Sequence, residues 1–369
     1  MAFQDHIEVM DKPKETTEYF KLGEIFSLSL QFCVGAIGFL GNILVCIVFG
    51  FLRSRKSQVN MFLFNQALVD LCTSILLIVY GATYIHDART DFQSTVNPPS
   101  EEMKYTDAGG QFLCRFWWSR FFLFSTFAIS SYNLLVMSIE RYIAVKRPLN
   151  YSNFFNTRTC MFVIFTVWIF PPIMQYIPAI FQYTYANNSC TERESWDRSD
   201  QVIFGICLFC WEYLLPVSIM GYMYFVIANT LRKRKSEVGV SLSRANASVC
   251  STQASPGNRM ASANQSTNMP PRGTKSSRNT TSTLFILFAV FVICWTPNQV
   301  TFLAYNVGGD VKVSSKWYQA TVILAFLNSC INPCIYCMRL KKFQMGLKLL
   351  LTCKARNETI LSLESTVSR

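Results

Sequence analysis

The sequence predicts an all-α membrane protein, a bundle of seven transmembrane helices followed by a short amphipathic eighth helix. Apolar residues make up 51% of the 369 residues and charged residues only 15%, well below the roughly 25% charge of soluble domains. The apolar residues form seven runs, each long enough to cross about 30 Å of hydrocarbon as a helix. Basic residues gather in alternate connecting segments, which is typical of cytoplasmic loops.

The seven runs together form a predicted domain over residues 25–338. They lie at about 25–51, 59–85, 112–144, 158–181, 201–231, 280–306 and 317–338. Backbone polar groups cannot stay unpaired in lipid, so each run is expected to be helical. Prolines inside the runs are expected to kink their helices without ending them, because neighbouring helices satisfy the freed backbone groups.

The connecting segments predict the orientation in the membrane. The loops after the first, third and fifth runs and the tail are basic, whereas the other segments are acidic in sum. Since basic loops stay in the cytoplasm, we expect residues 1–24 to be an extracellular amino terminus and residues 353–369 a cytoplasmic tail. Residues 1–24 lack the pattern of a cleavable signal peptide. Residues 236–279, dominated by Ser, Thr, Asn and Gly, are expected to be a disordered third inner loop.

An amphipathic helix is predicted over residues 339–352. Leu340, Phe343 and Leu347 recur at helical spacing with lysines between them, which is typical of a helix lying in the cytoplasmic lipid interface. Cys353 follows it, and this cysteine is expected either to carry a palmitate or to be an unmodified thiol.

Several classes of function are not expected. The net charge of +12 is spread over short loops rather than one folded basic face, which argues against nucleic-acid binding. Most of the fourteen cysteines lie inside apolar runs, and the two C-x-x-C pairs lack a partner pair for a metal. The only histidines are His6 and His86, in or beside outer segments, so no histidine-based enzyme site is expected. A membrane transporter is the alternative function of a different class, and the lack of an internal repeat argues against it.

Every apolar run carries polar, aromatic or proline features that lipid would not favour. In chain order they are Gly41-Asn42; Asp70; Ser130, Ser131 and Asn133, then Glu140-Arg141-Tyr142; Trp168; Pro216 and Tyr224; Phe291 and Cys294-Trp295-Thr296-Pro297; Asn328-Ser329, Asn332-Pro333 and Tyr336. This set resembles the rhodopsin-like (class A) G-protein-coupled receptors from about residue 25 to 353. Within that family the sequence is most similar to neuropeptide receptors. The resemblance implies a plasma-membrane receptor for an extracellular ligand.

The resemblance also implies roles for particular residues. Activation of a heterotrimeric G protein would involve Glu140, Arg141, Tyr142, Pro148, Tyr224, Asn332, Pro333 and Tyr336. An aromatic switch would comprise Trp295 and Phe291 at the Pro297 kink, with Pro216 in the fifth helix. A sodium ion, as an allosteric modulator, would lie among Asn42, Asp70, Ser130, Asn328, Ser329 and Asn332; the alternative is a polar network of hydrogen bonds and water without an ion. No other cofactor is expected.

On the expected outer side, the resemblance implies a disulfide between Cys114 and Cys190. The 27 residues from Cys114 to Arg141 are about two more than is common in the family. Either the top of the helix bulges or the disulfide is displaced. Asn187 begins a glycosylation sequence.

The expected ligand is a peptide, with a lipid or another non-peptide ligand as the alternative. Amines are bound in this family by a helix-three aspartate, whose position is Leu123 when counted from Arg141 and Phe121 when counted from Cys114. The acidic outer segments favour a cationic ligand. The candidate ligand-binding residues are Arg120, Leu123, Gln175, Glu212, Trp295 and Gln299. Arg120 and Glu212 either pair with each other or take opposite charges of a peptide.

Two further expectations concern the regulation of signalling. Receptors of this family often carry an acid at the cytoplasmic base of helix six, but the corresponding residue is Ser277, which predicts ligand-independent signalling. Thr359 and Ser362, with other hydroxyl residues of the tail, are either kinase sites that recruit arrestin or parts of a merely polar tail.

Overall fold

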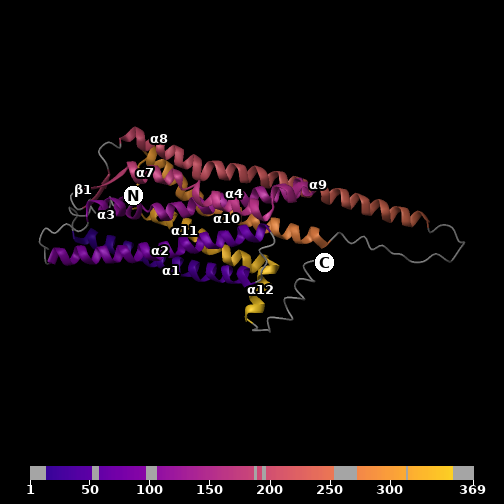
Figure 1. Cartoon of the computed structure of the whole chain (residues 1–369), viewed down its shortest axis with the longest axis horizontal. Coiled ribbons are helices and arrows are strands. Elements are labelled where there is room, and N and C mark those ends of the chain that lie inside the picture. Colours follow the sequence, from indigo (N-terminus) through magenta and orange to yellow (C-terminus); the bar gives the residue numbers. More distant parts are fainter. Residues whose placement is uncertain are drawn as a thin grey trace.

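The computed structural model describes residues 14–51, 58–96, 106–186, 189–192, 197–252, 272–312 and 315–351. Seven helical stretches in these ranges are long and apolar enough to cross a membrane: Phe26–Gly50, Gln58–His86, Asp107–Lys146, Thr157–Phe181, Arg198–Arg234, Asn279–Asn306 and Lys316–Arg339. Figure 1 shows their helices running side by side along the long axis of the molecule. The prediction of a multi-pass bundle of seven helices is confirmed.

The first two spans are the unbroken helices α1 (Lys14–Phe51) and α2 (Gln58–Val96). The third consists of α3 (Asp107–Phe112), the π-helix η4 (Leu113–Trp118) and α4 (Phe121–Lys146). The fourth consists of α6 (Thr157–Ile169) and α7 (Ile173–Phe181), which are separated at Pro171 and Pro172. The 3-10 turn η5 (Pro148–Asn150) and the short α5 (Tyr151–Phe154) connect the third and fourth spans.

Strands β1 (Tyr183–Ala186) and β2 (Ser189–Glu192) form an antiparallel pair after the fourth span. The fifth span consists of α8 (Arg198–Phe209), the π-helix η6 (Cys210–Leu214) and α9 (Leu215–Thr252). The sixth and seventh are α10 (Arg272–Val307) and α11 (Lys316–Arg339), and α12 (Lys341–Leu351) follows.

The third inner loop differs from its prediction. Helix α9 continues to Thr252 and α10 begins at Arg272, so both ends of the segment predicted to be disordered are helical. Adding a residue to an existing helix avoids the cost of nucleation, and residues 236–252 contain no proline and one glycine. Residues 253–271 lie outside the described part of the chain. Asn187, Cys353 and the tail hydroxyl residues lie outside it too.

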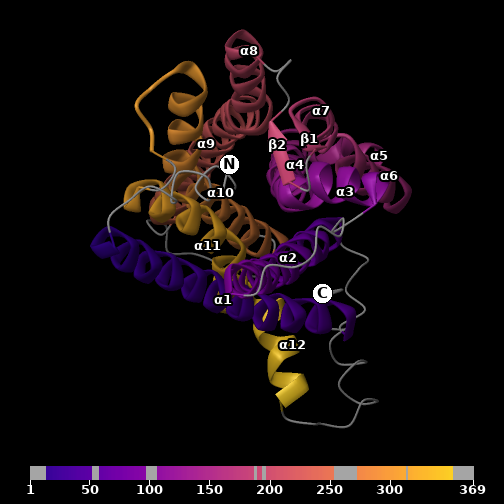
Figure 2. The ribbon, with the colours of Figure 1, turned by 90° about the vertical axis from the view of Figure 1, so that its left-hand side faces the viewer.

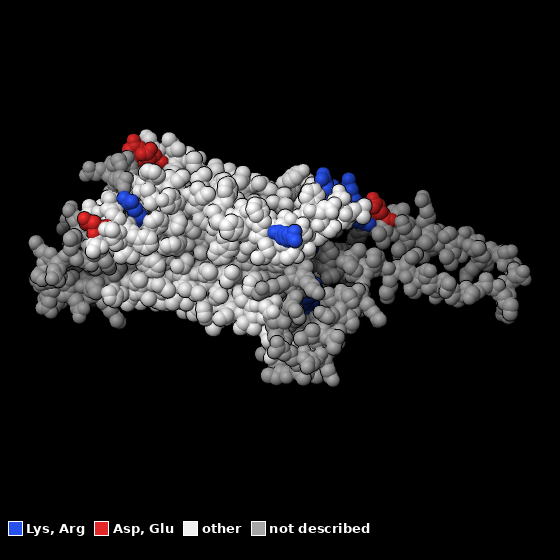
Figure 3. All heavy atoms as spheres, in the orientation of Figure 1, with Lys and Arg blue, Asp and Glu red and all other residues white. Residues whose placement is uncertain are grey.

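The core lies where the helices face each other around α4, which packs against α2, α6, α9 and α10. The third span is the most buried of the seven. Large apolar residues such as Leu40, Phe165 and Ile293 are exposed on the outside, as expected for surfaces that face lipid. On the face drawn in Figure 3, charged side chains lie at the left-hand end and from the middle of the picture to the right, and a broad uncharged stretch lies between these two sets.

Helix α12 turns away from the bundle axis beside α1, as the end-on view shows (Figure 2). Phe343 anchors it, because this side chain is fully buried and its ring lies 6.0 Å from that of Phe49. The predicted amphipathic segment is therefore helical and attached to the bundle. Its place in the lipid interface stays a prediction.

Candidate functional site

One end of α4 carries a buried ion pair. Glu140 is fully buried, and its carboxylate accepts hydrogen bonds from the guanidinium of Arg141. It also accepts a hydrogen bond from the hydroxyl of Tyr151 in α5. The sequence reasoning named Glu140 and Arg141 but missed Tyr151. Only its position three residues after Pro148, in the loop next to the pair, could have suggested this contact.

The tyrosines expected to meet Arg141 after activation lie deep in the same half of the bundle. The hydroxyl of Tyr224 accepts a hydrogen bond of 3.2 Å from the hydroxyl of Ser138. Tyr336 is fully buried, and its hydroxyl has no hydrogen-bond partner among the described residues. Pro148 begins η5 beside this end, and the next residue, Leu149, is 93% exposed. The partly buried Tyr142 follows Arg141 in α4.

Aromatic rings connect α4, α10 and α11 in the middle of the bundle. The ring of Trp295 lies 4.9 Å from that of Phe127 in an edge-on arrangement and 6.0 Å from that of Phe291. Phe127 also stacks on Phe326 at 5.7 Å. Pro297 lies inside α10 just beyond this cluster, and Pro216 lies at the start of α9 after the π-helix η6. Phe127 could not be singled out from the sequence, because it is one aromatic residue among many in its run.

Asp70 is fully buried at the centre of a polar network. Its carboxylate accepts a hydrogen bond of 2.7 Å from Asn332 and two of 3.2 and 3.3 Å from the amide of Gln66. The same amide donates to the hydroxyl of Ser130 at 2.6 Å. Asn42 donates to the carbonyl of Ser329 at 2.9 Å, and its own side-chain oxygen has no donor among the described residues. Asn328 is buried in α11.

These contacts bear on the expected sodium ion. A sodium ion would need oxygen atoms from Asp70 and Ser130 turned toward it, but a nitrogen donor of Gln66 touches both. As arranged, the residues do not fit the ion. They fit the alternative of a hydrogen-bonded network. The sequence reasoning missed Gln66, although it lies one helical turn before Asp70 and therefore on the same face of α2.

A cavity of about 280 Å³ opens among the spans at the other end of the bundle from Glu140. It is lined by all six residues expected to bind a ligand, namely Arg120, Leu123, Gln175, Glu212, Trp295 and Gln299. Phe121 lines it as well, so both residues found by counting along the third span face the same space. Neither carries a charge.

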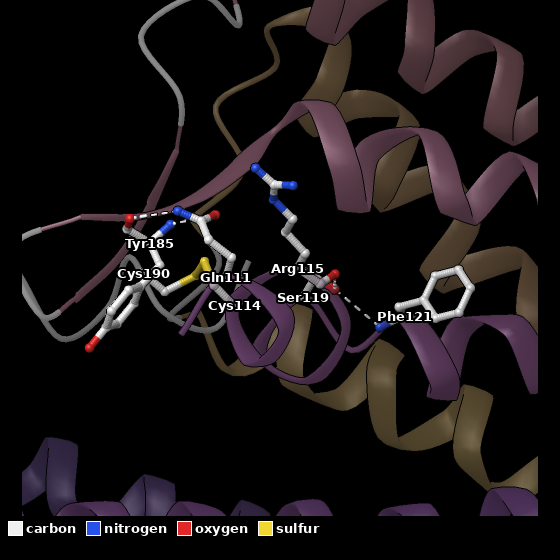
Figure 4. The surroundings of a disulfide bond; sticks show 7 residues. All are labelled: Gln111, Cys114, Arg115, Ser119, Phe121, Tyr185 and Cys190. Atoms are coloured by element: carbon white, nitrogen blue, oxygen red, sulfur yellow. Dashed lines mark hydrogen bonds between the residues drawn. A yellow bond between two sulfur atoms is a disulfide. The ribbon is translucent and has the colours of Figure 1, made fainter. Parts of the chain in front are cut away.

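The third span is broken at this cavity. The π-helix η4 is followed by Arg120, whose backbone is left-handed with φ of 58°, a conformation that is uncommon for residues other than glycine. The hydroxyl of Ser119 accepts the backbone N–H of Phe121 at 3.3 Å and so supports the restart of the helix (Figure 4). Of the two explanations for the long spacing from Cys114 to Arg141, the bulge at the top of the helix is the one observed.

The disulfide between Cys114 and Cys190 is confirmed, with Cα atoms 5.3 Å apart. It joins η4 to strand β2. Gln111 ties the same loop down, since its side chain donates to the carbonyl of Tyr185 at 2.8 Å and accepts from the backbone N–H of Tyr185 at 3.3 Å (Figure 4). The antiparallel pair of β1 and β2 is thus held against α3 and η4, at the end of the bundle where the cavity opens.

Of the two alternatives for Arg120 and Glu212, the structure does not show the ion pair. Among the residues that the structure describes, these two do not form an ion pair, because Glu212 accepts a hydrogen bond from Gln175 instead. Four tyrosines line the same cavity as Arg120, namely Tyr80, Tyr84, Tyr183 and Tyr318. The two charged side chains therefore line one cavity without pairing.

Comparisons with known proteins agree with this geometry. A family model described as the 7 transmembrane receptor (rhodopsin family) matches residues 41–336. Galanin receptor type 1 of Rattus norvegicus is 24% identical over 362 residues, which cover 95% of this chain and 89% of that receptor. The allatostatin-A receptor of Bombyx mori is 22% identical over 336 residues, covering 87% and 78%. The alpha-1A adrenergic receptor of Homo sapiens is 26% identical over 343 residues, covering 87% and 67%.

The family match spans the ion pair, the Asp70 network, the aromatic cluster and the disulfide, and it takes in most of the chain. The family marks a receptor and not an enzyme. The chain belongs to the rhodopsin family of seven-transmembrane receptors, the class A G-protein-coupled receptors.

Proposed function

We propose that this receptor binds an extracellular peptide at the plasma membrane and activates a heterotrimeric G protein in the cytoplasm. One observation carries the proposal. The single helix α4 has Leu123 in the wall of the cavity and the buried pair of Glu140 and Arg141 near its other end. A ligand that moves one end of a rigid helix changes the surroundings of the other end. Relatives named for galanin and allatostatin-A support the peptide ligand.

The charges of the cavity support a ligand that bears both signs. Arg120 and Glu212 line the same cavity without pairing. Both side chains are partly buried. Burial makes a charge costly without a counter-charge, and a ligand can supply one. We propose that an acidic group of the peptide lies at Arg120 and a basic group at Glu212. The acidic outer segments would attract the basic part of such a peptide.

An amine is a poorer candidate for this cavity. The alpha-1A adrenergic receptor is also a relative. However, the helix-three position at which amines are bound in this family is here Leu123 or Phe121, and both are apolar. A lipid is the remaining alternative, since aromatic and aliphatic side chains line much of the cavity.

The mechanism is a shift in population between two arrangements of the bundle. In the arrangement observed, Glu140 holds Arg141 through an ion pair inside the bundle. Binding in the cavity would favour an arrangement in which this pair opens and Arg141 becomes available to Tyr224, Tyr336 and the G protein. The exposed Leu149 next to Pro148 would dock on the same partner. Receptor kinases and arrestin are proposed as further partners of the tail.

The test is nucleotide exchange on a G protein in membranes that contain the receptor, screened against peptide, amine and lipid libraries. We expect peptides alone to increase exchange. Responses to amines or lipids alone would refute the peptide proposal. Failure of every ligand class to change exchange, together with ligand-dependent flux across the membrane, would favour a transporter.

Charge variants test the cavity once an agonist is known. Glu212→Gln and Arg120→Gln should each weaken agonist potency by about 30-fold, as expected if the bound ligand completes a desolvated charge pair worth about 2 kcal/mol. Arg115→Gln is the matched control. It removes an equal charge from η4, and Arg115 does not line the cavity. Equal potency in all three variants would contradict the assignment.

A further inference from the structure

The amide group of Gln66 occupies the space between Asp70 and Ser130. Gln66 is fully buried, and its side-chain nitrogen contacts both carboxylate oxygens of Asp70 at 3.2 and 3.3 Å and the hydroxyl oxygen of Ser130 at 2.6 Å. One nitrogen atom therefore faces three oxygen atoms. A cation bound to Asp70 and Ser130 would need this same place.

The orientation of this amide is fixed by a chain of hydrogen bonds. Trp168 donates its indole N–H to the side-chain oxygen of Asn65 at 2.9 Å. Asn65 donates to the oxygen of Asn133 at 3.0 Å, and Asn133 donates to the oxygen of Gln66 at 2.8 Å. The nitrogen of Gln66 is left to face Asp70. The chain thus runs in one direction from the indole to the carboxylate.

The two ends of the chain determine that direction. An indole N–H can only donate, and a carboxylate can only accept. Asn133 is fixed a second time, since its nitrogen also donates to the backbone carbonyl of Phe62 at 3.1 Å. Turning the oxygen of Gln66 toward Asp70 would require Asn133 to turn as well. Two oxygens would then meet at Asp70 and at the carbonyl of Phe62, and two nitrogens would meet at Asn65. The amide of Gln66 is therefore held with its donor toward Asp70.

We propose that the amide of Gln66 takes the place of a sodium ion beside Asp70 and makes this receptor insensitive to sodium. The N–H groups of Gln66 and Asn332 satisfy the carboxylate that an ion would otherwise coordinate. An N–H donor and a cation cannot occupy the same position, because both present positive charge to the same oxygens. This inference concerns the core of the bundle and does not depend on the identity of the ligand.

The experiment measures thermal unfolding of the purified full-length receptor in lipid nanodiscs while potassium chloride is replaced by sodium chloride at about 150 mM, so that screening is constant. The wild-type unfolding temperature should not change. Gln66→Leu replaces the amide by an apolar side chain of similar size. The unfolding temperature of this variant should rise by about 2 to 4 °C in sodium, as expected for a site that is half-saturated at about 30 mM sodium. The double variant Gln66→Leu/Asp70→Asn should lose this rise.

Thr73→Val is the matched control. Thr73 is equally buried in α2, but it bonds to Val69 and Thr126 rather than to Asp70, so its variant should stay insensitive to sodium. A saturable sodium-specific rise in the wild type that Asp70→Asn abolishes would overturn the proposal, and this result needs no variant of Gln66. A folded Gln66→Leu variant as indifferent to sodium as the wild type would overturn it too.

Discussion

Replacing Tyr151 by phenylalanine removes one hydroxyl group and is expected to raise basal signalling. That hydroxyl donates to the buried carboxylate of Glu140, which also holds Arg141. Burial and the neighbouring Glu140 raise the pKa of the Tyr151 phenol above its ordinary value. The phenol therefore stays protonated, and able to donate, throughout the physiological pH range.

The size of the effect follows from the bond that is lost. Hydrogen bonds to charged groups contribute about 1.5–3 kcal/mol. Tyr151 is only half-buried and Glu140 keeps its bond to Arg141, so the lower end of that range applies. If the bond exists only in the arrangement observed, a loss of about 1.5 kcal/mol raises the ratio of active to inactive receptor about tenfold.

The assay is nucleotide exchange on a G protein without ligand, at equal amounts of receptor in the membrane. Tyr222→Phe is the matched control, since Tyr222 is 64% exposed on the outside of the fifth span. Tyr151→Phe should increase basal exchange about tenfold and the control should not. Combining Tyr151→Phe with Glu140→Gln should give less than the sum of the two free-energy changes, because both variants remove the same contact. Basal exchange in Tyr151→Phe equal to that of the control would refute the reasoning.

Three further changes have defined outcomes. Ser277→Glu supplies an acid at the base of the sixth span and should lower basal exchange about two- to fivefold, as expected for an ion pair worth up to about 1 kcal/mol; unchanged exchange would count against it. Cys114→Ser breaks a disulfide that joins residues 76 apart in the sequence; it should destabilise the fold by about 4 kcal/mol and lower the unfolding temperature of the purified receptor. Gly110→Ala would place a methyl carbon 2.2 Å from the ring of Tyr185, and this overpacking should cost about 1–3 kcal/mol. Gly50→Ala, where the space is open, should leave the unfolding temperature nearly unchanged.

The seven spans could be predicted because burial in lipid requires long apolar runs and internal backbone bonding. Some of the candidate functional residues could also be identified from the sequence. A carboxylate in an apolar run, such as Asp70, or adjacent charges, such as Glu140 and Arg141, conflict with the surrounding solvent. Their partners could not be identified in this way. Tyr151 carries no signal of its own in the sequence, and the position of Gln66 could show only that it shares a face with Asp70. Their contacts with Glu140 and Ser130 of α4 give them their roles.

In the sequence, the break in the third span could be detected only from the number of residues between Cys114 and Arg141. A spacing about two residues longer than usual indicated extra chain somewhere between Cys114 and Arg141. The location of the extra residues depends on backbone geometry, here the π-helix η4 and the left-handed Arg120. For the same reason the sequence could not decide whether Arg120 and Glu212 pair with each other. The structure shows no ion pair between them.

The bulge at Arg120 also limits how this receptor can be compared with others. Two extra residues correspond to a rotation of about 200° on a helix with 3.6 residues per turn. An alignment that runs without a gap from Cys114 to Arg141 therefore assigns residues from opposite faces of the third span to one position. Comparisons of ligand selectivity need two separate frames, one counted from the disulfide for residues before Arg120 and one counted from Arg141 for residues after it. In the second frame, Leu123 lines the cavity at the position where an amine receptor of this family places its aspartate.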